Sequence, residues 1–334
     1  MSEKLQPIQE WHNVDAHVFE NEILTQYKPA ILRGLVKQWP VVQQALQSPE
    51  AVCKYLRGLD NGTDVDAITV PPDEKLRIFY QKNMDGFNFL QSRIPVSKVL
   101  DQMVSYAKLK NPPSIAAQSA PTPSCLPKFM HENMLPLLNG MVPPRIWIGN
   151  SIITPAHIDE SHNIACSVAG RRRFTLFPPE QAPNLYLGPI DFNPTGSPIS
   201  MVSLKEPDFE RYPKFKEALA ATQVAELEPG DAIFIPAVWW HHVESLEKIN
   251  VLVNYWWKTS AGSPFACLLH CALSLNNMTP DLKQAWGALF NHFIFNPNEN
   301  PLEHIPEHKR GVLGNPPPEL VRNLKGWISG QLQG

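Results

Sequence analysis

The sequence predicts a mainly β fold with added α-helices, organised as a β-sandwich or a double-sheet jelly roll. Short apolar runs, most of them bounded by Gly, Pro or Asn, recur at close spacing between residues 145 and 258. The chain of 334 residues holds 34 prolines, about twice the usual share of ~5%. Apolar residues make up 43% of it, which is enough for a sizeable core. Many prolines beside many apolar residues indicate a compact, loop-rich protein.

Residues 1–110 are expected to form an α/β elaboration of the core. Pro29–Leu35 has a short strand pattern that ends at a glycine turn, and Ser48-Pro49-Glu50 is a helix start. The expected elements are strands at 30–35, 67–70 and 76–80 and helices at 48–56 and 98–106.

Residues 111–144 form a proline-rich connection that could be a linker or a lid. Its short apolar pieces predict one helical turn around 135–138. It is too apolar for a disordered segment.

Residues 145–258 carry the β-rich core, interrupted by an insertion from 183 to 221 with one expected helix at 214–221. Residues 265–334 show apolar residues at helical spacing. The expected core strands are 145–148, 164–168, 172–177, 224–227, 232–235, 239–243 and 249–256, and the expected C-terminal helices are 265–275, 280–295 and 318–332.

Charge and composition exclude several classes of protein. The net charge of −3 and the pI of about 6.4 disfavour a nucleic-acid partner. The sequence contains no run of about 18 apolar residues, so no membrane span is expected. The first residues lack the apolar region of a signal peptide. The five cysteines are odd in number and scattered, which favours the reducing cytoplasm.

The sharpest cluster is the sequence T-P-A-H-I-D at 154–159. His157 and Asp159 are two residues apart, so on a strand both would face one cavity. An imidazole beside a carboxylate suits a borderline divalent ion, and a third ligand is expected from a distant strand. The alternative is a histidine at a surface or strand end, with about even odds for this pattern alone.

A second cluster runs from Glu228 to Val243 and contains P-G-D, a turn signal, followed by W-W-H-H. Consecutive strand residues face opposite ways, so only one of His241 and His242 can face the cavity. The alternative is one histidine in a core hydrogen bond and the other in solvent. Glu244 and Glu247 are expected to be solvated.

Together the clusters supply two histidines and one carboxylate. Such a facial triad leaves open positions for a bidentate substrate and oxygen, and it points to non-heme Fe(II). Structural zinc would prefer four closed ligands, and no cysteine pairs are placed for that.

Four stretches resemble the JmjC (cupin-like) Fe(II)- and 2-oxoglutarate-dependent oxygenases. They are T-P-A-H-I-D-E-S-H-N, G-R-R-R-F-T-L-F-P-P, P-G-D-A-I-F-I-P-A-V-W-W-H-H-V-E-S and V-N-Y-W-W-K. The likeness is closest to the factor-inhibiting-HIF asparaginyl hydroxylase type, and it extends over most of the chain. It implies a double-stranded β-helix (jelly roll) core with an N-terminal α/β elaboration and C-terminal helices.

The resemblance also implies a site. By position, His157, Asp159 and His241 would be the iron ligands and the catalytic set, with His242 outside. The co-substrate 2-oxoglutarate and O2 would join Fe(II) there. The positions that match co-substrate or iron neighbours are Thr154, Asn163, Asn254 and Trp256.

Two positions depart from the family pattern. In this family a Lys usually binds the distal carboxylate of 2-oxoglutarate, and here Arg172 stands at the matching position. Arg171 and Arg173 are expected on the other face of the strand. Arginine still offers a charged, bidentate fork to a carboxylate. A tyrosine that reaches the co-substrate is also missing, and Ser114 or Gln118 would serve instead.

The function implied is hydroxylation of a protein or peptide side chain, with the proline-rich loops as substrate walls. Hydroxylation of an RNA nucleoside or a small metabolite is an alternative. A metal-binding cupin regulator without turnover and a zinc-dependent cupin isomerase or hydrolase are rivals of other kinds. Histone lysine demethylation is less favoured, because the chain lacks a zinc module or reader domain. The C-terminal apolar stripe of Trp286, Leu289, Phe290 and Phe293 indicates a core face or a dimer interface. The resemblance implies that a homodimer through those helices is possible.

Overall fold

The computed structural model describes residues 7–138, 142–258, 260 and 262–332. The first six residues of the expected α/β elaboration, residues 139–141 of the proline-rich connection and the last two residues of the helical region lie outside these ranges. The chain divides into two compact units, Met1–Phe265 and Ala266–Gly334.

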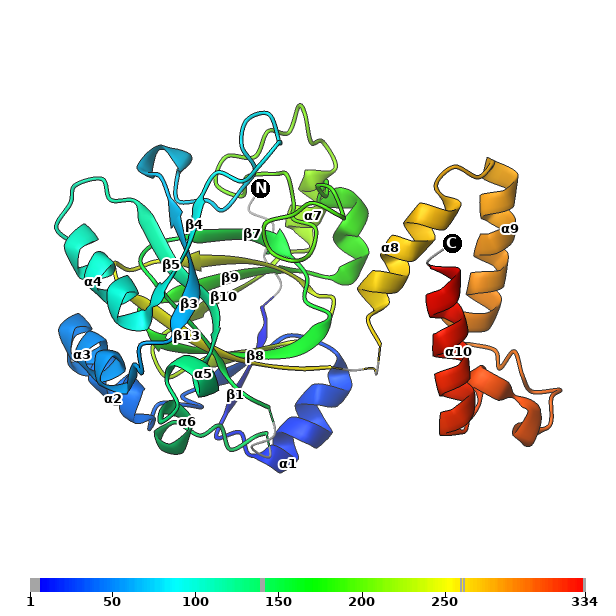
Figure 1. Cartoon of the computed structure of the whole chain (residues 1–334), viewed down its shortest axis with the longest axis horizontal. Helices are drawn as coiled ribbons and strands as arrows, with labels where there is room; N and C mark the ends of the chain where they lie inside the picture. Colours follow the sequence, from blue (N-terminus) through cyan, green and yellow to red (C-terminus); the bar gives the residue numbers. More distant parts are fainter. Residues whose placement is uncertain (1–6, 139–141, 259, 261, 333–334) are drawn as a thin grey trace. The chain divides into compact units, whose positions relative to one another are not determined.

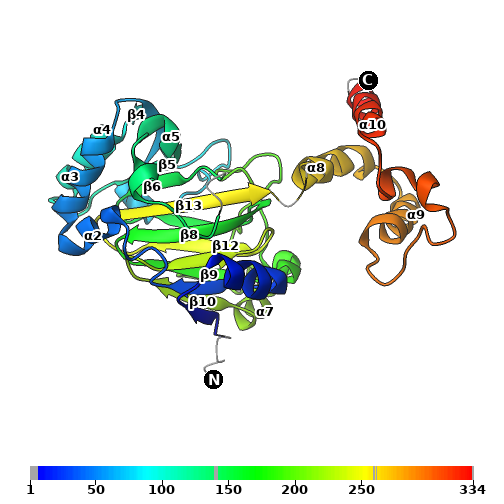
Figure 2. The same ribbon diagram turned by 90° about the horizontal axis from the view of Figure 1, so that it is seen from below.

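The first unit is built on two facing β-sheets (Figures 1 and 2). Neighbouring strands are antiparallel except for the parallel pair β1–β2. The nine-stranded sheet has the order β1 (Gln9–His12), β2 (Ala30–Arg33), β11 (Ala232–Ile235), β8 (Ser161–Ala169), β13 (Asn250–Lys258), β6 (Arg145–Gly149), β5 (Ser114–Pro121), β3 (Asp64–Val70) and β4 (Leu90–Pro95). The four-stranded sheet has the order β10 (Gln223–Leu227), β9 (Arg172–Phe177), β12 (Trp240–Ser245) and β7 (Ile153–His157).

Alternating side chains divide the core into layers. On β13, Leu252 points between the two sheets, whereas Val251 and Val253 point to the opposite face of the nine-stranded sheet. That face packs on α2 (Pro40–Gln47), α3 (Pro49–Leu59) and α4 (Val96–Tyr106), which lie along one side of the sheet in Figure 1. The outer face of the four-stranded sheet packs on α7 (Phe215–Ala220). The jelly-roll core is therefore confirmed as a mainly β fold with helices on its outer faces.

Most expected elements of the first unit are confirmed, and the exceptions have local causes. The expected strand at 76–80 is wrong, because Lys75 and Leu76 take positive φ angles of 51° and 65° and leave only isolated bridges beyond them. The expected helical turn at 135–138 is also wrong, since α6 (Phe129–Glu132) forms one turn earlier. Strands β1, β4 and β5 were not expected.

The stretch from 111 to 144 contributes β5, which pairs with β3 and β6, and the short helix α5 (Thr122–Cys125). The insertion at 183–221 contains the end of a 3-10 helix, Pro179–Asn184, and α7. Both segments therefore lie against the core sheets.

The second unit is helical, as expected, and α8 begins just before it. Its main helices are α8 (Pro264–Leu275), α9 (Pro280–Phe290), which continues as a π-helix at Asn291–Phe295, and α10 (Pro318–Gln331). Large apolar side chains remain exposed on it, among them Trp286 and Phe295. Within the described residues, the helices all fall short of the length and apolar character that a membrane crossing needs.

Candidate metal centre

Three side chains from the two sequence clusters meet between the sheets. The metal-binding atoms of His157, Asp159 and His241 all lie within 4.8 Å of one another. His157 and His241 are direct partners across the β7–β12 ladder, and their ring centroids are 4.2 Å apart. His242 points to the opposite face, as strand alternation predicts.

Backbone carbonyls fix the orientation of both imidazoles. Nδ1 of His157 lies 2.9 Å from the carbonyl oxygen of Pro155, and Nδ1 of His241 lies 3.0 Å from that of Trp239. A carbonyl can only accept, so each Nδ1 carries a proton, and in the neutral ring the lone pair of Nε2 is left for a metal. Pro155 is tolerated because β7 is an edge strand.

Asp159 does not lie on the strand with His157, contrary to the sequence interpretation, because β7 ends at His157. The backbone N–H of Val238 donates to the Asp159 carbonyl at 2.8 Å and holds the loop in place. Val238 takes a φ of +67°, a strained conformation for a β-branched residue. A strained turn before W-W-H-H therefore positions the carboxylate.

A chain of hydrogen bonds orients this carboxylate. Trp256 Nε1 donates to Asp159 Oδ2 at 3.0 Å, and Asn163 Nδ2 lies 3.4 Å from the same oxygen. Asn254 Nδ2 in turn lies 3.4 Å from Asn163 Oδ1, and Trp147 Nε1 donates to Asn254 Oδ1 at 2.9 Å. Such outer partners hold a ligand in its binding orientation before the metal arrives.

Burial and a neighbouring ring keep His157 neutral. Removal from water lowers its pKa, the nearby His241 lowers it further, and Asp159 opposes both effects. A metal ligand must be an unprotonated imidazole, so the site favours the form that binds metal.

The three ligands lie in a cavity of about 260 Å³. The structure places every other sequence-predicted site residue in its wall, namely Thr154, Asn163, Arg172, Asn254 and Trp256. Of the two candidates for the missing tyrosine, Gln118 lines the cavity, whereas Ser114 donates its hydroxyl proton to the Ser151 carbonyl at 2.7 Å.

Arg172 is the cation of this cavity. It is 8% exposed, and burial lowers its pKa to about 10, so it stays charged at neutral pH. In the described part of the chain it makes no ion pair or side-chain hydrogen bond. Arg171 and Arg173 face outward and pair with Glu247 and Glu226 at 2.9 and 2.6 Å, as predicted.

Sequence reasoning missed several residues of the wall. Trp147 could have been found, because in R-I-W-I-G it alternates with the buried Ile146 and Ile148. Ser119 enters the wall through a bulge between β5 and β6, where it takes a φ of +48°. Thr195 comes from the insertion. Neither of the last two has a local sequence signal.

The donor set fits an iron site with a chelating acid. Two imidazoles and one carboxylate in one cavity leave coordination positions open, as a non-heme Fe(II) site requires. A buried, uncompensated guanidinium in the same cavity calls for an anionic group on whatever fills it.

Two further hollows adjoin this cavity. One, of about 640 Å³, lies over β3 and β4 and shares Gln118 and Pro194 with it. The other shares Asp159, Thr195 and Trp256 with it. Both hollows therefore have wall residues in common with the cavity that holds the His-Asp-His group.

Comparison with known proteins agrees with this geometry. Lysine-specific demethylase JMJ31 of Arabidopsis thaliana is 30% identical over 210 residues, 62% of this chain and 34% of that protein. HSPB1-associated protein 1 of Rattus norvegicus is 39% identical over 113 residues, 33% of this chain and 23% of that protein. Bifunctional peptidase and (3S)-lysyl hydroxylase JMJD7 of Homo sapiens is 26% identical over 259 residues, 69% of this chain and 77% of that protein.

The aligned part therefore spans about a quarter to a third of the first two relatives. The family model described as cupin-like domain matches residues 16–263, most of the chain and all of the metal centre. The chain therefore belongs to the cupin-like domain family.

Proposed function

We propose that the protein is an Fe(II)- and 2-oxoglutarate-dependent dioxygenase that hydroxylates a side chain of a protein or peptide. One observation carries the proposal: a His-Asp-His group and an unpaired, buried arginine share one cavity. This pairing of a facial triad with an anion-binding cation suits a 2-oxo acid that chelates iron. Relatives named as a demethylase and a lysyl hydroxylase support the same class.

The residues would divide the work as follows. His157, Asp159 and His241 would hold Fe(II), which supplies the redox chemistry and the open positions for the oxo acid and O2. Arg172 would bind the distal carboxylate through its planar fork. The remaining wall residues would shape and orient the co-substrate, namely Thr154, Asn163, Asn254, Trp256 and Gln118.

A protein or peptide substrate is supported by the two hollows that adjoin the metal centre. An extended chain could enter over β3 and β4, pass Gln118 and Pro194, and leave past Thr195. In the hollow over β3 and β4, Asp66 and Arg93 form an ion pair at 3.4 Å, so this hollow carries little net charge. This disfavours RNA, which requires a basic tract.

We further propose a homodimer through the C-terminal helices and a cytoplasmic location. Exposed apolar side chains on α9 and the π-helix, including Trp286, Leu289 and Phe293, support the dimer. Free cysteines support the reducing compartment. Light scattering of the wild type and of a Trp286→Glu variant tests the dimer. A monomer mass for both proteins would contradict it.

Demethylation of a lysine side chain is a second candidate, favoured by the similarity to Lysine-specific demethylase JMJ31. Both reactions begin with insertion of oxygen into a C–H bond, so the metal centre does not separate them. Peptides with plain and methylated lysine, followed by mass spectrometry, would distinguish them: a gain of one oxygen indicates hydroxylation, and loss of a methyl group indicates demethylation.

The test of the proposal is succinate formation from 2-oxoglutarate by purified protein with Fe(II) and ascorbate. We expect turnover that disappears in Asp159→Ala. If the wild type neither turns over nor binds 2-oxoglutarate in calorimetry, the proposal is wrong, and the metal-binding regulator without turnover replaces it. If nucleosides or metabolites are turned over and no peptide is, the oxygenase proposal stands and only the proposed substrate class is wrong.

A further inference from the structure

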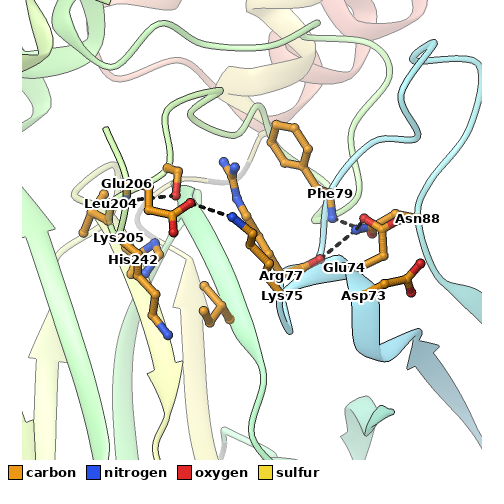
Figure 3. A pocket seen from close by; sticks show the side chains of 12 residues that line it. Asp73, Glu74, Lys75, Arg77, Phe79, Asn88, Leu204, Lys205, Glu206 and His242 are labelled. Atoms are coloured by element: carbon orange, nitrogen blue, oxygen red, sulfur yellow. Dashed lines mark hydrogen bonds and ion pairs between the residues drawn. The ribbon is translucent and has the colours of Figure 1, made fainter. Parts of the chain in front are cut away.

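A second cavity, of about 360 Å³, lies on the other side of the four-stranded sheet (Figure 3). Strand alternation separates the two sites: His241 faces the metal centre, and His242 faces this second cavity. On β7, Thr154 faces the former and Ile153 the latter in the same way. The second cavity is therefore not part of the oxygenase site.

Arg77 is the cation without a charged partner in this cavity. Its Nη2 donates to the carbonyl oxygens of Ser200 and Val202 at 3.1 and 3.2 Å, and its guanidinium carbon lies 3.8 Å from the centre of the Phe79 ring. No carboxylate of the described residues lies within ion-pair distance of it. Its Nε and Nη1 groups therefore keep N–H donors for a ligand.

The other cations of the cavity already have carboxylate partners. Lys75 pairs with Glu206 at 2.6 Å, and Lys205 lies 3.5 Å from Glu244. Glu244 is 8% exposed, so the expectation that it is solvated is wrong. The positive charge that remains in the inner wall is thus that of Arg77.

His242 supplies a second polar group without a partner. It is 4% exposed, and its Nε2 makes no hydrogen bond to the described residues. The nearest carboxylate oxygen, on Glu244, is 3.8 Å away, beyond hydrogen-bond distance. A buried ring nitrogen without a partner costs free energy that a bound ligand would recover.

We propose that this cavity binds a small molecule that carries a carboxylate, held between the Arg77 guanidinium and the His242 imidazole. The two backbone carbonyls occupy Nη2, so a carboxylate would accept a single charge-assisted hydrogen bond from the free Nε or Nη1 group of Arg77. The exposed acids Asp73 and Glu74 repel anions of higher charge, such as nucleic acid. The Phe79 ring provides an apolar surface for the body of the ligand.

The experiment must separate this cavity from the metal centre, because Arg172 also attracts carboxylates. Metal-free Arg172→Gln protein is therefore the reference, and acetate and succinate are the probes. Binding is followed by calorimetry and by the ring nitrogen resonances of His242, at constant ionic strength. We expect saturable binding that shifts the His242 signal.

Adding Arg77→Gln to this reference should weaken binding by about tenfold, since a charge-assisted hydrogen bond is lost. Adding Lys205→Gln should weaken it by about threefold, because that ammonium is largely exposed and already paired. Arg57→Gln, a surface arginine that pairs with Asp101 and lines neither this cavity nor the metal centre, is the matched control and should change nothing. Circular dichroism melting confirms that each variant folds.

Absence of saturable binding in the reference protein overturns the proposal. The proposal is also overturned if Arg77→Gln and Lys205→Gln leave the binding affinity unchanged, or if binding does not shift the ring nitrogen resonances of His242. Tighter binding of inorganic phosphate than of succinate overturns the carboxylate assignment.

Discussion

Replacing Arg172 with methionine is expected to have two effects of opposite sign. Burial lowers the pKa of this guanidinium from 12.5 to about 10. The difference of about 2.5 times ~1.4 kcal/mol means that the charged side chain costs the folded protein roughly 3–4 kcal/mol. Methionine fills similar space without charge, so the ligand-free protein should become more stable by up to roughly 3–4 kcal/mol.

The pH dependence has a defined sign. The folded pKa is lower than the unfolded one, so the penalty is present in full below about pH 10 and declines as the pH rises through that value. The stability gained by Arg172→Met should therefore be constant from pH 6 to pH 9.

The opposite effect concerns 2-oxoglutarate. At a hundredfold excess over its Kd, a ligand stabilises the wild type by about 2.7 kcal/mol. Loss of the carboxylate's buried partner costs about 3–5 kcal/mol, which is a loss of at least about a hundredfold in affinity. The ligand-dependent stabilisation should therefore vanish in Arg172→Met.

Calorimetric unfolding of metal-loaded protein with and without 2-oxoglutarate measures both effects. Arg171→Met is the matched control, because the Arg171 side chain is exposed and pairs with the exposed Glu247 at the surface. It should leave stability almost unchanged and keep the ligand effect. An Arg172→Met protein that is less stable without ligand, yet still stabilised by 2-oxoglutarate, would refute this reasoning.

Three further predictions follow from other parts of the structure. Trp256→Phe removes the hydrogen bond to Asp159 and should weaken metal binding by about tenfold; unchanged affinity in a metal titration would contradict the orienting role. Val238→Gly relieves a positive φ and should raise the free energy of unfolding in urea by about 1 kcal/mol, and a lower value would argue against strain. Burial raises the pKa of the Cys125 thiol to about 11, so at pH 8.5 iodoacetamide should modify the exposed Cys267 and spare Cys125; peptide mapping by mass spectrometry would reveal equal labelling if this is wrong.

The sequence predicts the interior best where strand alternation decides the orientation. It places Arg172 inward between Arg171 and Arg173, and it separates His241 from His242, because a strand turns successive side chains to opposite faces.

The sequence predicts less where distant segments meet. Thr195 and Ser119 enter the cavity through loop and bulge geometry, which depends on tertiary packing. Glu244 is buried because Lys205 and Arg173 reach it from other elements. The finer likeness to the asparaginyl hydroxylase type, the roles of the site residues and the domain boundaries stay predictions.

The two carbonyl oxygens that receive the Nδ1 protons of His157 and His241 belong to the main chain. Every amino acid carries the same carbonyl, so substitutions at Pro155 and Trp239 that preserve the strand path would leave the protonation pattern of both rings intact. Asp159 has no such protection, because the side chains of Trp256 and Asn163 hold its carboxylate. Accumulating substitutions should therefore displace the Asp159 carboxylate before they change the orientation of the two imidazoles.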